Sequence, residues 1–132
     1  MTIDCVDEIQ GAAELSDWFG GFPSFHDAYA QLQLTGEGTG WLKVRGARMT
    51  DRVDESGYFV LEKRFVATLF LDEIKSVSLS DFMPGEIIIG QLDFRKIDDA
   101  IEVDFDTAYG LAGVISARRI RIEFTAMPTE GG

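Results

Sequence analysis

The chain has 132 residues, of which 45% are hydrophobic, and this size and composition are typical of one folded domain. Its 12 basic and 23 acidic residues leave a net charge of -11, which argues against nucleic acid and anionic membranes as partners and favours a basic one. Cys5 is the only cysteine, so an intrachain disulfide is impossible. With no secretory signal and no apolar run near the roughly 20 residues that cross a bilayer, we expect a soluble, cytoplasmic protein.

The first predicted element is a helix at residues 6–19, "VDEIQGAAELSDWF". Its apolar residues recur at approximately helical spacing, Asp4 can cap its start, and Gly20 and Gly21 can end it. Pro23 then forces an extended path and rules out a longer helix.

From residue 27 onward, apolar and polar residues alternate with the period of two that indicates β-strands. Turn-forming segments such as "GEGTG" and "MPGE" separate the alternating runs. The charged segment at 50–57 has no apolar period, so we expect a solvated loop there. In one run Ile88, Leu92 and Phe94 share a face, and Gly90 indicates a bulge. The predicted strands are residues 28–34, 41–49, 58–74, 74–82, 87–94, 100–106 and 114–126.

About seven strands therefore follow one N-terminal helix, which predicts a single α+β domain over residues 1–132. Short connections and one apolar face per strand favour mainly antiparallel strands in a meander. The sheet is expected either to curve around the helix or to fold into a sandwich.

The segment "WFGGFPSFHDAYAQLQL" at 18–34 contains the only histidine, His26. His26 and Asp27 are adjacent, so in an extended segment their side chains point to opposite faces and cannot form a catalytic dyad. A lone histidine among aromatic residues is typical of a hydrogen-bonded corner, with Asp27 capping backbone amides at the strand entry. We therefore interpret the motif as structural. Its members are Trp18, Phe19, Gly20, Pro23, Phe25, His26 and Asp27.

Acidic residues alternate along the predicted strand at 100–106 and share its outer face. Such a stripe could serve acid–base chemistry or sugar hydrolysis, which needs two carboxyl groups at a definite separation. We favour cross-strand charge pairs with Arg119 and Arg121 of the last strand, on a face that can bind another protein. The predicted partner-binding residues are Asp51, Asp54, Glu55, Glu102, Asp104, Asp106 and Tyr109.

No pattern of residues indicates catalysis, a metal or a cofactor. Cys5 has no neighbouring sequence that would activate it as a nucleophile. One histidine and one cysteine do not match a zinc site, and no calcium loop is present. "GEGTG" lacks the lysine of a phosphate-binding loop. We expect neither enzyme activity nor a cofactor.

The stretch "DWFGGFPSFHDAYAQLQL" at 17–34 resembles the opening signature of the immunity protein 50 family of bacterial polymorphic-toxin systems. Residues 74–94 and 103–122 are similar to the middle and the close of that family, where a Tyr/Phe-Gly loop precedes a strand with paired basic residues. The resemblance implies a small cytoplasmic protein that neutralises a toxin by tight binding, without catalysis. The acidic charge suits a basic toxin such as a nuclease, because an acidic inhibitor can occupy a surface evolved for phosphates.

Two other interpretations stay open. The chain could be an acidic housekeeping or scaffold β-domain that forms a homodimer through an exposed strand edge. It could also be an enzyme that uses His26 with a remote carboxylate. A glutamine at position 26 separates a catalytic role, which predicts a folded but inactive variant, from a structural one, which predicts destabilisation.

Overall fold

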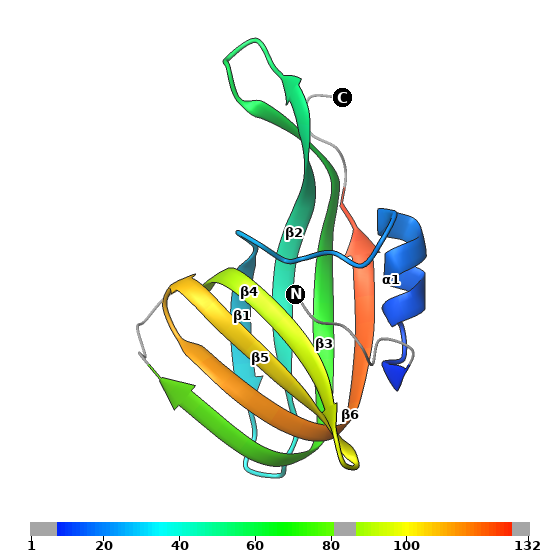
Figure 1. The fold of residues 1–132 in the computed structure, drawn as a ribbon, viewed down its shortest axis with the longest axis vertical. Helices are drawn as coiled ribbons and strands as arrows, with labels where there is room; N and C mark the ends of the chain where they lie inside the picture. The colour runs from blue at the N-terminus through cyan, green and yellow to red at the C-terminus, as the bar shows by residue number, and fades with distance from the viewer. Residues whose placement is uncertain (1–7, 81–86, 128–132) are drawn as a thin grey trace.

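The computed structural model describes residues 8–80 and 87–127, apart from the side chains of residues 49–51, 59–61, 108 and 109. One short helix precedes a set of mainly antiparallel strands, so the predicted α+β class is confirmed at this level, with strands dominant (Figure 1). The elements are α1 (Ala12–Phe19), β1 (Tyr29–Leu34), β2 (Gly40–Val53), β3 (Phe59–Ser80), β4 (Ile87–Ile97), β5 (Ala100–Tyr109) and β6 (Ala112–Ala126).

The strands close into a barrel in the order β1-β2-β3-β6-β5-β4, and every ladder between them is antiparallel. β6 lies between β3 and β5, and β4 closes the barrel on β1 where Tyr29 pairs with Ile88 and Ala30 with Ile87. The sheet curves, but it closes on its own apolar core and not around the helix as predicted, and the alternative of a sandwich is wrong. The predicted meander holds within β1-β2-β3 and within β4-β5-β6, and it fails at the step from β3 to β4. Alternation reveals which way side chains point, whereas it does not reveal which strands become neighbours.

β3 joins the two strands predicted at 58–74 and 74–82. It bends where Glu73 adopts a left-handed φ of 53° and where the register with β6 shifts between Ile74 and Ser76. Divided at this bulge, the sheet has the predicted seven runs; counted as continuous strands, it has six within the described residues. A β-bulge bends a strand without ending its ladder, so it looks like a strand boundary in the sequence.

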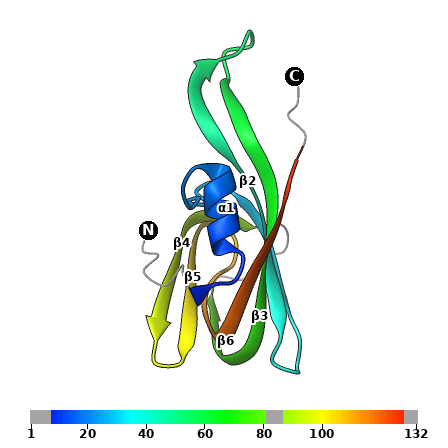
Figure 2. The same ribbon diagram turned by 90° about the vertical axis from the view of Figure 1, so that its right-hand side faces the viewer.

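Beyond the barrel, β2 and β3 continue as a two-stranded ribbon that projects from one end (Figures 1 and 2). The segment predicted as a loop at 50–57 is therefore partly strand, because β2 continues to Val53. At the tip, the Asp54 carboxylate accepts the backbone N–H groups of Ser56 at 2.9 Å and of Tyr58 at 3.0 Å. The polar residues at 54–57 therefore form the turn at the tip of the ribbon.

Apolar side chains on the inner face of each strand fill the barrel. The prediction for β4 is wrong at Ile88, which is half-buried, while Ile87 and Ile89 are buried. Register shifts on both sides of Ile89, next to Gly90, change the face that each residue occupies. The largest fully buried side chains are Phe65, Phe94, Phe105, Leu15, Leu42, Leu69, Ile89, Leu92, Ile115, Val44 and Val103.

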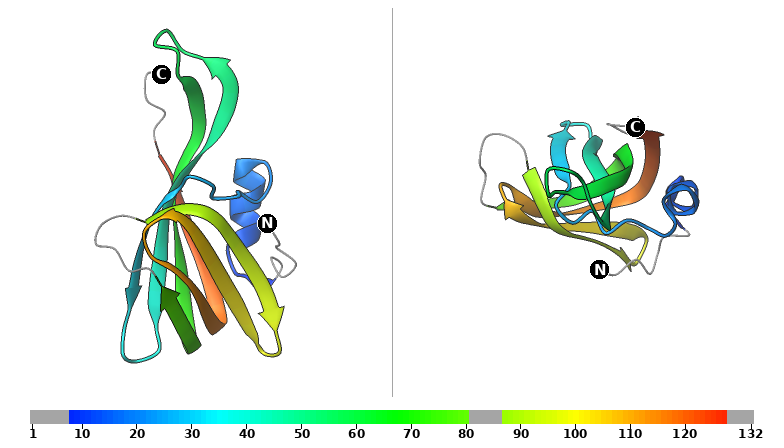
Figure 3. Two further views of the ribbon diagram at one scale, coloured as in Figure 1. Left: turned by 60° about the vertical axis from the view of Figure 1, so that its left-hand side comes forward. Right: turned by 90° about the horizontal axis from the view of Figure 1, so that it is seen from above.

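Helix α1 lies outside the barrel, beside β6 (Figure 3). It starts at Ala12 and not at residue 6, and the predicted cap Asp4 lies outside the described residues. Gly11 delays the start, because its φ of 90° is left-handed and a Cβ there would lie 1.9 Å from the Ile122 carbonyl oxygen. The helix ends at Gly20, as predicted. Among the described residues, no helix is long and apolar enough to cross a membrane.

Candidate functional site

The motif at residues 18–27 lies across the end of the barrel from which the ribbon projects (Figures 1 and 3). The ring of Phe25, which is 3% exposed, packs edge-to-face on Phe65 at 6.0 Å between centroids, and Phe22 packs on Phe94 at 5.9 Å. Trp18 of α1 reaches the same Phe65 at 6.1 Å. Most of the motif's apolar surface is therefore used to attach the helix and cover the barrel end.

His26 and Asp27 approach each other, so the prediction that they face opposite sides is wrong. His26 Nε2 lies 3.6 Å from Asp27 Oδ2, because Asp27 adopts a left-handed φ of 63° in a turn. His26 Nδ1 donates to the Gly90 carbonyl oxygen at 2.8 Å, and Ser24 Oγ accepts from the backbone N–H of His26 at 3.3 Å. The His26 side chain is 66% exposed. Nδ1 is held by the Gly90 carbonyl, Nε2 lies beside the Asp27 carboxylate, and within the described residues no hydroxyl or thiol is hydrogen-bonded to either ring nitrogen.

Asp27 joins the motif to β4 through its backbone. Its N–H donates to the Ile89 carbonyl at 2.8 Å, and the Ile89 N–H donates to the Ala28 carbonyl at 2.9 Å. In the described part of the chain, the Asp27 carboxylate caps no backbone amide, contrary to the prediction. A pocket of about 410 Å³ adjoins this corner, and Arg48 lines it. The Arg48 guanidinium donates a hydrogen bond to the Phe19 carbonyl and lies over the Phe19 ring. The contacts of this corner that the structure describes are those of aromatic packing and of a turn.

Acidic side chains gather on the outer face where β4, β5, β6 and the end of β3 lie side by side. Asp93 of β4 pairs directly opposite Asp104 of β5, and Gln91 pairs opposite Asp106. These four side chains line a shallow pocket of about 370 Å³. We call this surface the acidic groove. It comprises Ser78, Ser80, Gln91, Asp93, Arg95, Glu102, Asp104 and Asp106.

Four carboxylates against one arginine give the acidic groove three net negative charges. Arg95 donates to Glu102 at 2.6 Å and to Asp104 at 3.1 Å, and the hydrogen bond to Glu102 raises the pKa of Arg95. Asp93 accepts a hydrogen bond from the Gln91 amide at 2.9 Å. Within residues 8–80 and 87–127, the Asp106 carboxylate has no ion pair. Like charges opposite each other in a sheet repel, so this face attracts cations.

The predicted pairing of the β5 carboxylates with Arg119 and Arg121 is wrong. β5 pairs with β6 only at residues 101–105 and 113–117, so both arginines lie past the end of that ladder. Arg119 instead pairs with Asp72 of β3 at 2.6 Å. The β5 carboxylates Glu102 and Asp104 form their ion pairs with Arg95 of β4, and not with the two β6 arginines.

Two of the other predicted partner-binding residues, Asp54 and Glu55, are exposed at the tip of the ribbon, away from the acidic groove. Asp51 lies in β2 and Tyr109 ends β5, and the side chains of both are outside the described ones. The structure thus brings together the three predicted carboxylates of β5 and separates them from Asp54 and Glu55.

The sequence prediction missed Asp93, although its position between two inward side chains, Leu92 and Phe94, placed it on the outer face. Its importance depends on Asp104 across the ladder, which alternation within one strand cannot reveal.

No group of three or more His, Cys, Asp or Glu side chains in the described ranges is arranged to hold a metal ion. No protein-family model, curated protein or solved structure matches this chain.

Proposed function

We propose that this chain is a binding protein without catalytic activity that neutralises a bacterial toxin, as its resemblance to the immunity protein 50 family implies. Its partner is a protein with a basic surface, such as a nuclease, which docks on the acidic groove. The observation that carries the proposal is the direct opposition of Asp93 and Asp104, with Arg95 as the groove's single cation. We assign the protein to the cytoplasm, because a chain with one cysteine has no need of an oxidising compartment.

The charge arrangement supports binding because it is unfavourable in the free protein. Carboxylates directly opposite each other destabilise a sheet, whereas opposite charges there stabilise it. A basic partner adds positive charge to the single cation, Arg95, that the groove residues contain, so the repulsion is relieved in the complex. The net charge of -11 adds a long-range attraction that speeds association and weakens as salt screens it, with a Debye length of about 8 Å at physiological ionic strength.

Co-expression and affinity measurements test this proposal. Each neighbouring gene is expressed in cells with and without this protein. The affinity of each purified neighbouring gene product for this protein is then measured by calorimetry at low and high salt. We expect growth rescue from one neighbouring toxin and an affinity that falls as salt rises. If no neighbouring product is neutralised or bound, the proposed function is wrong.

A matched pair of variants then tests the acidic groove. The triple change Asp93→Asn, Asp104→Asn and Asp106→Asn removes three charges from the groove. The control, Glu14→Gln, Asp17→Asn and Glu37→Gln, removes three charges from exposed positions elsewhere. We expect at least about a hundredfold loss of affinity for the first and less than about threefold for the second. Equal losses would show that net charge, and not the groove, determines binding.

A homodimeric scaffold domain is the second candidate function, and the far end of β3 favours it. Val77 and Leu79 there are 41% and 42% exposed, and in the described part of the chain residues 76–80 pair with β6 alone. An open strand edge with apolar side chains is a site for strand addition. Sedimentation velocity of the wild type and of Leu79→Lys tests this, since a dimer that the change dissociates would support it and a monomer at all concentrations would reject it.

A further inference from the structure

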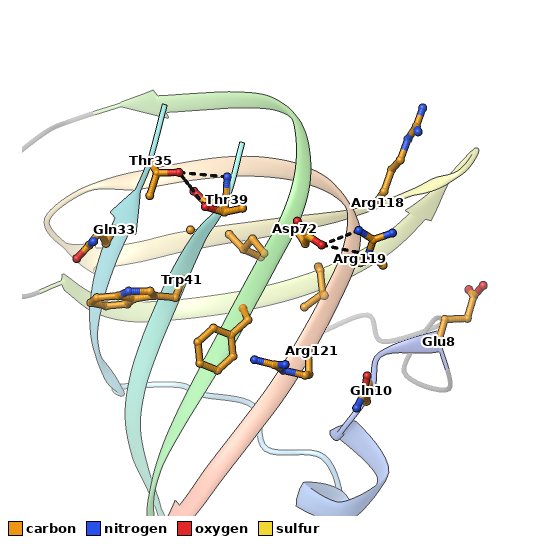
Figure 4. A pocket seen from close by; sticks show the side chains of 14 residues that line it. Glu8, Gln10, Gln33, Thr35, Thr39, Trp41, Asp72, Arg118, Arg119 and Arg121 are labelled. Atoms are coloured by element: carbon orange, nitrogen blue, oxygen red, sulfur yellow. Dashed lines mark hydrogen bonds and ion pairs between the residues drawn. The ribbon is translucent and has the colours of Figure 1, made fainter. Parts of the chain in front are cut away.

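A third hollow lies on the outer face of β1, β2, β3 and the central part of β6, on a different part of the barrel from the acidic groove (Figure 4). Its volume is about 620 Å³, within the range of pockets that bind small molecules. We call it the aromatic pocket. One row of directly paired residues crosses it from strand to strand and consists of Gln33, Trp41, Phe70 and Arg121.

The charged side chains that line the aromatic pocket are all neutralised within the protein. Each has an oppositely charged side chain within ion-pair distance, so these lining residues are neutralised, and Lys43 beside the Trp41 ring is a further cation near them. The pairs are Asp72 with Arg119 at 2.6 Å, Glu8 with Lys96 at 2.7 Å, Arg118 with Asp99 at 3.2 Å and Arg121 with Glu123 at 3.3 Å.

Two partly exposed aromatic rings form the apolar part of the pocket. Trp41 and Phe70 occupy opposed positions on β2 and β3. The Lys43 ammonium lies 5.3 Å from the Trp41 ring, and the Arg121 guanidinium lies 4.5 Å from the Phe70 ring. These cation–π contacts hold the two cations against the rings. The pocket therefore has two partly exposed aromatic rings at its centre.

Uncharged polar groups line the rim beside Trp41 (Figure 4). Thr35 Oγ1 donates to the Thr39 carbonyl at 3.2 Å, lies 2.8 Å from Thr39 Oγ1 and accepts from the backbone N–H groups of Glu37 and Thr39. The Thr35 hydroxyl is therefore filled within the hairpin turn, and Thr39 Oγ1 is the hydroxyl that the turn offers to a ligand. The Gln33 amide has no hydrogen-bond partner among the residues that the structure describes. An amide both donates and accepts, so Gln33 can bind either kind of group on a ligand.

We propose that the aromatic pocket binds a neutral saccharide, with one sugar ring lying against Trp41 and its hydroxyl groups bonded to Gln33 and to the Thr35–Thr39 turn. A sugar ring has an apolar C–H face for an aromatic surface and hydroxyls that donate and accept at its edge. The net charge of -11 repels anionic ligands and leaves a neutral one unaffected. The inference does not depend on the proposed partner of the acidic groove.

The test is a titration of the purified full chain with maltotriose, cellotriose and chitotriose, followed by the indole N–H signal of Trp41 in NMR spectra. The chain has two tryptophans, and the Trp41→Leu variant assigns the signal by its loss. We expect a saturable shift with at least one saccharide. Affinity measured by calorimetry should fall about tenfold or more in Trp41→Leu and less in Gln33→Ala.

Tyr29→Leu is the matched control, because Tyr29 is another aromatic residue on the same outer face, 46% exposed, that does not line the pocket. It should leave saccharide affinity unchanged. Unfolding curves confirm that each variant is folded. The proposal is overturned if none of the three saccharides shifts the Trp41 signal at millimolar concentration. It is also overturned if a single-stranded oligonucleotide or a polyglutamate peptide shifts that signal and the saccharides do not.

Discussion

The acidic groove and the aromatic pocket are two parts of one barrel surface, and they differ in how charges meet across the strands. In the pocket, Asp72 pairs directly opposite Arg119. In the groove, Asp93 pairs directly opposite Asp104. Both surfaces follow the same alternation of inward apolar and outward polar residues. The comparison shows that alternation brings charges to the surface, whereas the strand register decides whether they neutralise one another.

This difference has an electrostatic consequence for each surface. The hydrogen bond from Arg119 lowers the pKa of Asp72, and the same contact raises the pKa of Arg119. In the groove, Arg95 is shared between Glu102 and Asp104. A neutralised surface suits a neutral ligand, and an acidic surface suits a basic one. Both proposed binding functions thus depend on strand register, which opposes unlike charges in the pocket and like charges in the groove.

The largest expected loss of stability comes from truncating Phe65, a residue of the core that both surfaces share. Phe65 is 1% exposed and contacts the rings of Trp18, Phe19 and Phe25. Phe65→Ala should lower the free energy of unfolding by about 3–5 kcal/mol, because it leaves a cavity in the core. Urea unfolding measures this loss, and NMR spectra should show both surfaces perturbed.

Val66→Ala is the control for that change, since Val66 is the next residue of β3 and is only half-buried. It should cost well under half as much. If Phe65→Ala perturbs the groove and leaves the pocket intact, the two surfaces do not share one frame, and the comparison between them fails.

Neutralising one aspartate on each surface should change stability in opposite directions. Asp93→Asn removes a repulsion with Asp104 and keeps an oxygen that can accept from Gln91, so it should stabilise the fold by about 0.2–1 kcal/mol. Asp72→Asn removes the charge that Arg119 pairs with, so it should destabilise the fold. Urea unfolding at neutral pH measures both. A destabilising Asp93→Asn would show that the groove carries no net repulsion.

Acid should distinguish Asp72→Asn from the wild type. Because Arg119 lowers the pKa of Asp72 in the folded protein, the ionised carboxylate contributes stability above its unfolded-state pKa, and this contribution is lost as pH falls through the folded pKa. Asp72→Asn should therefore lose less stability than the wild type between neutral pH and about pH 3. Unfolding midpoints across this range measure the difference. An unchanged pH slope in Asp72→Asn would mean that the pair with Arg119 does not contribute in solution.

Much of this fold was predictable from alternation, and the errors have a common physical cause. The outward position of the acidic residues of β5 and the helix end at Gly20 follow from local rules, and the structure confirms them: the residues between those carboxylates, Val103 and Phe105, are buried. Bulges are less visible, because one extra residue at Gly90 or Glu73 changes the face of every residue that follows. Strand order depends on contacts between distant segments, so a closed barrel could not be told from a meander.

The candidate sites show the same limit. The outer stripe of β5 was predictable within its own strand, whereas Asp93 became part of the groove through the β4–β5 register. The aromatic pocket draws on β1, β2, β3 and β6, and its members Gln33, Trp41 and Phe70 have no recognisable motif in the sequence. A site assembled from single residues on several strands leaves no local pattern to read.

The most local expected effect is at His26, whose hydrogen bond connects the N-terminal motif to the groove and not to the pocket. Its Nδ1–H bonds the carbonyl of Gly90, the residue directly before Gln91 of the groove. His26→Ala should cost about 0.5–1.5 kcal/mol for one exposed hydrogen bond, at the lower end because the ring is 66% exposed. Backbone amide exchange should quicken at Gln91 and stay unchanged at Trp41, because the ladder of β1 and β2 that holds Trp41 does not involve Gly90. His26→Gln keeps a side-chain donor, so its loss of stability should lie between that of the wild type, which is zero, and that of His26→Ala. Equal changes at both amides would mean that the motif supports the whole barrel, and unchanged exchange at Gln91 would mean that the Gly90 bulge holds its shape without the histidine.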